Sequence, residues 1–376
     1  MPQNVTYPGV FVEEMPEPPK PIEGVPTSIT AFVGATKKGV MNRPVRVTHF
    51  AEFERQFGPH SAGLTTSYAV AQFFTNGGRE AIIVRVAKGA SMAKTVAGIR
   101  ALDAVDLFNL LVLPGHTAPA IFAAAADYCR TRRAFFIADP PEKIATPAGM
   151  IAFVRSSKFR RSPNAAIYFP WTTVSDPLNN GHPRPLPPGG TIAGLIARTD
   201  ATRGVWKSPA GPDASLIGVK SLAFLLNDDD SDPLNAAGMN CLRTFRTFGL
   251  VAWGARTLEG TDELASEWKY VAVRRLGLFI EESIARGTHW AVFEHNAETL
   301  WARLRMVIGD FLVKLHRAGA LQGATAKQAF FVKCGVDTMT ANDLANGFLN
   351  IEVGFAPLRP AEFVVIKIRH CFTCER

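Results

Sequence analysis

The feature that most constrains this fold is a regular alternation of strand-like and helix-like segments across residues 95–255. Apolar runs typical of buried strands occupy residues 107–115, 133–141 and 164–171, and helical patterns separate them. Strands that alternate with helices indicate a sheet with helices on its faces. We therefore predict a mixed α/β (α+β) fold for this part of the chain.

Length predicts more than one domain, because a chain of 376 residues exceeds what one hydrophobic core usually contains. We place an N-terminal arm at residues 1–22, an α/β domain at 23–250 and a C-terminal domain at 251–376. Residues 23–90 could pack with either domain.

The pattern of residues 1–22 predicts a strand followed by a proline-rich tether. Proline removes backbone donors and favours an extended chain, so a tight return hairpin is disfavoured and a neighbouring sheet edge is within reach. The alternative is a frayed terminus, and the residues alone leave both open. The strand residues in question are Thr6, Tyr7, Val10, Phe11, Val12 and Glu13.

Two amphipathic helices are predicted between Trp268 and Arg317. On the second helix an apolar stripe is flanked by Arg303, Lys314 and Arg317, with Arg305 on the opposite flank. This basic flank is a candidate contact for an acidic partner. A solvated charged face is the alternative.

The chain closes with two segments, FLNIEV and EFVVIKIR, that we expect to pair as strands. A long apolar strand with a bare edge invites aggregation, so a partner should cover it. The residues of this candidate pairing strand are Phe363, Val364, Val365, Ile366, Lys367 and Ile368.

Composition describes a soluble protein with 47% apolar and 20% charged residues. The net charge of +8 favours an acidic partner, yet the cations are scattered and form no nucleic-acid-binding tail. Five scattered cysteines fit a reducing compartment. The sequence contains no apolar run long enough to span a membrane and no secretory signal pattern, so we expect folding in the cytoplasm.

The sequence contains no recognised catalytic motif, and we expect no cofactor. The segment GATKKG lacks the ending of a phosphate loop, and Asp139 is expected to end a strand and cap a turn. The acidic segment 227–233 lacks the glycine and glutamate of a calcium loop, so a turn is expected there. HCFTC offers too few ligands for zinc.

Four segments together resemble the sheath proteins of contractile injection systems, namely contractile phage tails, R-type pyocins and extracellular phage-tail-like particles. They are YPGVFVEE with PIEGVPTSITAFVG, the central DPLNAAGMNCLRTFRTFGLVAWGARTL, the helical stretch from WKYVAVRRLGLFIEESI to FFVKC, and the closing IEVGFAPLRPAEFVVIKI. The resemblance is less distinct over residues 95–230, and the tail HCFTCER departs from it.

The resemblance implies a structural subunit and no enzyme. It implies a helical homo-oligomer of stacked hexameric rings around an inner tube protein, with baseplate and terminal cap proteins as further partners. It implies an outer α/β domain, and an inner domain whose sheet is completed by strands of neighbouring subunits. Thr6–Glu13 and Phe363–Ile368 become exchanged strands, and Arg303, Lys314 and Arg317 become candidate tube contacts. Assembly is expected in the bacterial cytoplasm, without nucleic acid or membrane insertion.

Two other functions compete with this interpretation. One is an α/β nucleotide-binding enzyme built on residues 95–255, which the missing motifs disfavour. The other is a basic, nucleic-acid-associated phage structural protein, which would bind DNA with a steep dependence on salt.

Overall fold

The computed structural model describes residues 20–156, 159–358 and 364–371, the last range by its backbone alone. The predicted arm strand Thr6–Glu13 lies outside the described residues, as do Phe363 and Cys374.

An eight-stranded sheet forms the larger body, in the order β11-β10-β6-β5-β4-β1-β3-β2. Six central strands run parallel, and the two edge strands β2 and β11 pair antiparallel. The mixed α/β fold predicted from the alternation is therefore confirmed. The strands are β1 (Thr30–Ala35), β2 (Pro44–Val47), β3 (Ala81–Val86), β4 (Leu110–Val112), β5 (Phe135–Ala138), β6 (Ala165–Phe169), β10 (Asn240–Phe245) and β11 (Gly249–Ala252).

Helices cover both faces of this sheet, because successive strand residues point to opposite faces. In β1, Ala31 and Val33 join one core and Phe32 joins the other. One core includes residues of α3 (Met92–Arg100), η1 (Ala101–Ala104), α4 (Pro119–Thr131), α5 (Pro147–Arg155) and α7 (Asp228–Ala236). The other includes residues of α1 (Phe50–Phe57), α2 (Thr66–Thr75) and α6 (Gly189–Arg203).

Two local predictions for this body were wrong. The acidic segment expected as a turn is helix α7, because Asn227 and Asp230 form a capping box and three aspartates occupy its first turn. Residues 176–218 are rich in proline and glycine, a composition that predicts an exposed loop or one arranged against a neighbour, but they begin at the end of β7 (Thr172–Asp176) and contain η2 (Pro177–Asn179) and β8 (His182–Leu186). With β9 (Val219–Leu222) they form a small sheet in the order β8-β7-β9, and the two prolines of β8 sit on its edge strand.

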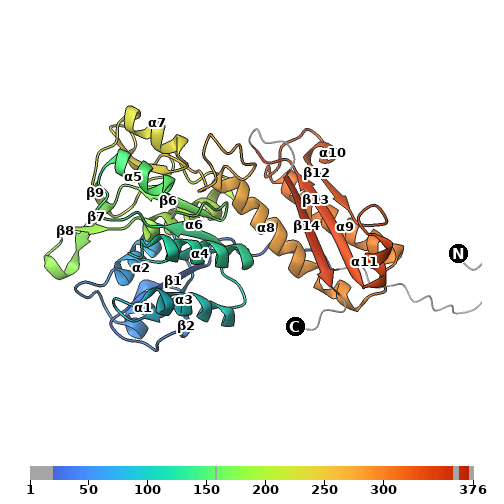
Figure 1. The fold of residues 1–376 in the computed structure, drawn as a ribbon, viewed down its shortest axis with the longest axis horizontal. Coiled ribbons are helices and arrows are strands. Elements are labelled where there is room, and N and C mark those ends of the chain that lie inside the picture. The colour runs from blue at the N-terminus through green and yellow to red at the C-terminus, as the bar shows by residue number, and fades with distance from the viewer. Residues whose placement is uncertain (1–19, 157–158, 359–363, 372–376) are drawn as a thin grey trace, which may run out of the picture.

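A second, smaller body follows at the C-terminus (Figure 1). Its antiparallel sheet has the order β12-β13-β14, and four alternating residues of β13 enter the core: Leu349, Ile351, Val353 and Phe355. Its elements are α8 (Val271–Gly287), η3 (His289–Phe293), α9 (Glu298–Arg317), α10 (Ala326–Ala329), β12 (Phe330–Lys333), α11 (Ala341–Ala345), β13 (Phe348–Phe355) and β14 (Val364–Cys371). The predicted helices and the predicted pairing of the closing strands are confirmed.

Helix α8 connects the two bodies and belongs to the core of each (Figure 1). Val271 and Leu278 pack into the core of the large body. Leu276 and Ile280 pack into the core of the small body.

Candidate assembly surfaces

The basic flank predicted on α9 is present at its C-terminal end. Lys314 and Arg317 are exposed and form no ion pair with any residue that the structure describes. Asp310 lies on the same exposed side of the helix. Lys314 and Arg317 are three residues apart in the helix, so they are neighbours on one face.

Arg303, the third residue of the predicted flank, is already partly engaged within the chain. Its guanidinium lies 3.6 Å from the Glu294 carboxylate and 4.8 Å from the centre of the Trp290 ring. Arg305 on the opposite flank is engaged more fully, by Glu298 at 2.5 Å and by the Cys334 carbonyl. The helical pattern therefore predicted the face correctly, but not that Arg303 has an internal partner.

Uncharged residues lie on the same outward side of α9. Met306 is exposed, and a Cβ atom added to Gly309 would meet nothing within 4 Å. A glycine inside a 20-residue helix costs about 1 kcal/mol relative to alanine. No contact within the described chain requires that glycine.

The C-terminal edge is formed by β14, which pairs with β13 on one side only. The register runs antiparallel from Phe348 opposite Cys371 to Phe355 opposite Val364. Among the described strands, none pairs with the other side of β14. The backbone groups of Val364–Ile368 therefore line an edge that could accept a further strand.

A buried ion pair fixes the first half of α8 to the large body. The Arg275 guanidinium donates two hydrogen bonds to Asp200 of α6, at 2.8 and 2.6 Å, and one to the Thr27 carbonyl at 2.8 Å. The Thr27 hydroxyl donates to the same carboxylate at 2.6 Å. Both charged side chains are only 4% exposed, so each depends on the other for its neutralisation.

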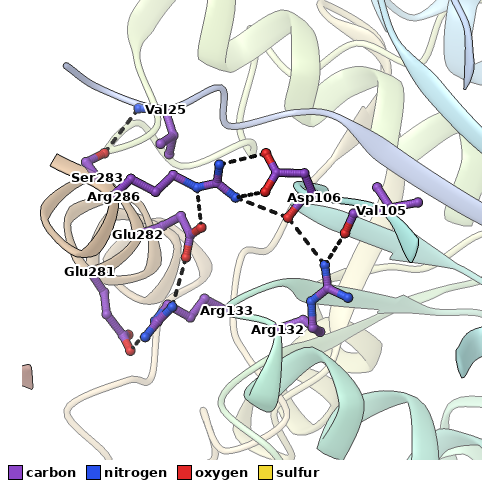
Figure 2. Close-up of polar contacts among 9 residues, drawn as sticks. All are labelled: Val25, Val105, Asp106, Arg132, Arg133, Glu281, Glu282, Ser283 and Arg286. Carbon is purple, nitrogen blue, oxygen red and sulfur yellow. Dashed lines mark hydrogen bonds and ion pairs between the residues drawn. The ribbon is translucent and has the colours of Figure 1, made fainter. Parts of the chain in front are cut away.

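A more exposed network holds the second half of α8 (Figure 2). Arg133 donates to Glu281 at 2.9 Å and to Glu282 at 3.1 Å. Glu282 also accepts from Arg286 at 2.6 Å, and Arg286 forms a two-pronged pair with Asp106 at 2.8 and 3.0 Å. Hydrogen bonding by Arg286 lowers the pKa of Asp106. We call these five residues the α8 junction.

Nothing in the sequence analysis singled out the α8 junction or the buried pair beside it. Their members lie on separate elements, up to 180 positions apart. Arg133 follows the C-cap of α4, where helices commonly place glycine, but this position is recognised only once the end of α4 is known.

Asp139, considered above as a strand-ending residue, is buried at the ends of β5 and α6. Its carboxyl accepts hydrogen bonds from the Gly189 N–H at 2.8 Å and the Gly115 N–H at 3.3 Å. Burial raises its pKa to about 7, and these two hydrogen bonds oppose the shift. Asp139 therefore caps the N-terminus of α6, which lies 50 residues further along the chain, and not the turn that directly follows β5.

Metal-binding geometry and membrane-spanning helices can also be assessed for the described part of the chain. No three His, Cys, Asp or Glu side chains there gather closely enough to hold a metal ion. No helix there has the length and hydrophobicity needed to cross a bilayer.

Comparisons with known proteins agree on one family. Residues 87–258 match the phage tail sheath protein central domain, and residues 263–370 match the phage tail sheath C-terminal domain. A putative prophage major tail sheath protein of Pseudomonas aeruginosa is 29% identical over 291 residues, which are 75% of this chain and 71% of that protein.

Solved structures give the same result over nearly the whole chain. The contracted sheath complex of the extracellular contractile injection system PVC superposes with a TM-score of 0.79 at 28% identity, covering 97% of each chain. A chain in the contracted anti-feeding prophage baseplate structure gives 0.77 at 30% identity, covering 96% of this chain and 99% of that chain. The fold is thus that of contractile sheath proteins. The chain belongs to the phage tail sheath family.

Proposed function

We propose that this chain is the sheath subunit that polymerises as stacked hexameric rings around an inner tube, and that contraction of the sheath drives the tube through a target envelope. The observation that carries the proposal is the superposition on subunits of a contracted sheath over 97% of each chain. In this role the chain has no catalytic activity of its own, and its partners are other copies, the tube protein, the baseplate and a terminal cap.

In this proposal the exposed end of α9 contacts an acidic inner tube. Lys314 and Arg317 are the main contacts, because both are free of ion pairs among the described residues. Arg303 contributes less, because Glu294 and Trp290 already engage it. Exposed ion pairs are worth roughly 0–1 kcal/mol each, which suits a contact that must break when the sheath contracts.

Replacing Lys314 and Arg317 by glutamine tests this contact. We expect sheaths that assemble without a bound tube, seen by electron microscopy of purified particles. A matched control removes the same charge from Arg46 and Arg55, which are exposed on the large body. Normal tube-filled particles from the α9 variant would refute the contact.

We also propose that the arms join subunits by strand addition, Thr6–Glu13 at one end and Phe363–Ile368 at the other. The unpaired edge of β14 among the described strands supports the second arm. Deleting residues 1–14 should leave a folded monomer by circular dichroism while abolishing stable sheaths. Normal sheaths from this deletion would refute arm exchange at the N-terminus.

A further inference from the structure

Arg133 has a backbone conformation that its residue type disfavours. It directly follows α4 and its C-cap Arg132, and its φ is 49°, in the left-handed region. The helix end imposes this conformation: the Ala134 N–H donates to the Cys129 carbonyl at 2.8 Å, the long bond of a Schellman motif. Glycine is the usual residue at this position, because a Cβ atom is crowded there.

Three other described non-glycine residues have a positive φ: Asn42 and Asn180, a residue type that tolerates the left-handed region, and Ala265, whose methyl group is the smallest side chain. Arg133 has no such local hydrogen-bonding side chain. A bulky residue persists in a disfavoured conformation when the surrounding structure requires it. The helix end sets the backbone conformation, and what glycine at position 133 would lack is the set of contacts made by the arginine side chain.

Both described ion-pair partners of the Arg133 side chain lie on α8. Its Nε and Nη1 donate to two consecutive carboxylates, Glu281 and Glu282, which are 25% and 13% exposed (Figure 2). A forked guanidinium can hold two carboxylates at once, whereas lysine is a single point charge. Hydrogen bonds and charges from both glutamates outweigh the effect of burial and raise the pKa of Arg133, so it stays charged.

The preceding residue reaches α8 by a second route. Arg132 donates to the Leu102 carbonyl at 2.9 Å and to the Asp106 carbonyl at 3.4 Å. Asp106 in turn holds Arg286 of α8. The turn after α4 is thus connected to the second half of α8 directly through Arg133 and indirectly through Asp106.

We propose that Arg133 is a positioning residue that couples α8 to the eight-stranded sheet, and that its guanidinium fixes the orientation in which α8 presents the C-terminal body. The first half of α8 is held by the buried Arg275–Asp200 pair. The second half is held by the partly exposed α8 junction and by the Val25 N–H, which donates to the Ser283 hydroxyl at 3.1 Å. The consequence for a sheath lattice depends on the proposed function, whereas the coupling inside one chain does not.

The test is hydrogen–deuterium exchange by mass spectrometry on the full-length unassembled chain. Arg133→Gly removes the side chain and also relieves the backbone. We expect amides 281–287 of α8 to exchange about five-fold faster, as the loss of two partly exposed pairs implies. Amides in the first half of α8 should change little. Arg130→Gln, which removes an exposed arginine of the same helix, is the control and should leave all of α8 unchanged.

A purely structural role for Arg133 as a helix cap predicts a different result. If Arg133 were only a tolerated cap, Arg133→Gly would raise the thermal midpoint and leave exchange over 281–287 within about two-fold of the parent chain. That outcome would overturn the proposal. Should Arg133→Gly fail to fold, Arg133→Lys replaces it in the test. Lysine keeps the positive charge and the unfavourable backbone conformation but cannot bind two carboxylates as the guanidinium does. Unchanged exchange of amides 281–287 in Arg133→Lys would also overturn the proposal. A normal sheath with accelerated exchange would support the coupling and separate it from sheath formation.

Discussion

Breaking the buried ion pair between α8 and α6 should destabilise the chain more than any exposed pair does. Arg275→Met keeps much of the side-chain volume but leaves the Asp200 carboxylate buried without its cation. Loss of one partner of a buried pair costs about 3–5 kcal/mol. The Thr27 hydroxyl, 2.6 Å from Asp200, still donates to the carboxylate, so we expect the lower end, about 3 kcal/mol.

Urea unfolding followed by fluorescence and circular dichroism measures this loss. The control is Asp213→Asn, which removes the partner of Arg203 at the end of α6. That pair is 56% and 75% exposed, so its loss should cost less than about 1 kcal/mol. Equal effects of Arg275→Met and Asp213→Asn would refute the reasoning.

A double variant distinguishes the effect of the unpaired buried charge from the effect of lost packing. Arg275→Met combined with Asp200→Leu removes both buried charges, and such replacements are often neutral or stabilising. The double variant should therefore recover most of the lost stability. Failure to recover would mean that packing, and not the unpaired charge, accounts for the loss.

Three further substitutions test the structure at other points. Gly309→Ala should raise the free energy of unfolding by about 0.5–1 kcal/mol, because alanine favours the helix and the added Cβ meets nothing; a loss in urea titrations would contradict this. Gly190→Ala should cost about 1–3 kcal/mol or more, because its Cβ would lie 2.3 Å from the Ala69 carbonyl oxygen, and a neutral effect would show that α2 and α6 can separate. The folded chain holds the Asp139 proton more tightly than the unfolded chain, so the stability tied to this group is full below its ordinary pKa of 3.8 and is lost as pH rises through about 7. Asp139→Asn should flatten urea midpoints measured between pH 4 and 8, and an unchanged slope would refute the burial effect.

Local sequence patterns predicted the parts of the fold that depend on neighbours in the chain. The strand–helix alternation predicted a sheet with helices on its faces, and the apolar spacing of α8 and α9 predicted both helices. The prediction of a turn at residues 227–233 was wrong because aspartate is common in turns, whereas here Asn227 caps a helix and the aspartates occupy its first turn.

Contacts between distant elements could not be predicted in this way. Helical spacing placed Arg303 on the basic flank, but Glu294 and Trp290, which engage it, precede α9 and contact it only after folding. Asp200 and Arg275 likewise meet only when α6 and α8 pack together. Arg133 begins the segment 133–141 that the sequence pattern predicted as a strand, so neither its position at the end of α4 nor its partners on α8 could be predicted.

The central claim, that this chain is a contractile sheath subunit, is tested most directly by electron microscopy of the protein expressed with its inner tube protein. We expect long striated tubes with six-fold symmetry in end views, in extended and in shorter, wider contracted forms. A chain that stays monomeric with the tube protein present, at every salt concentration tried, would contradict it.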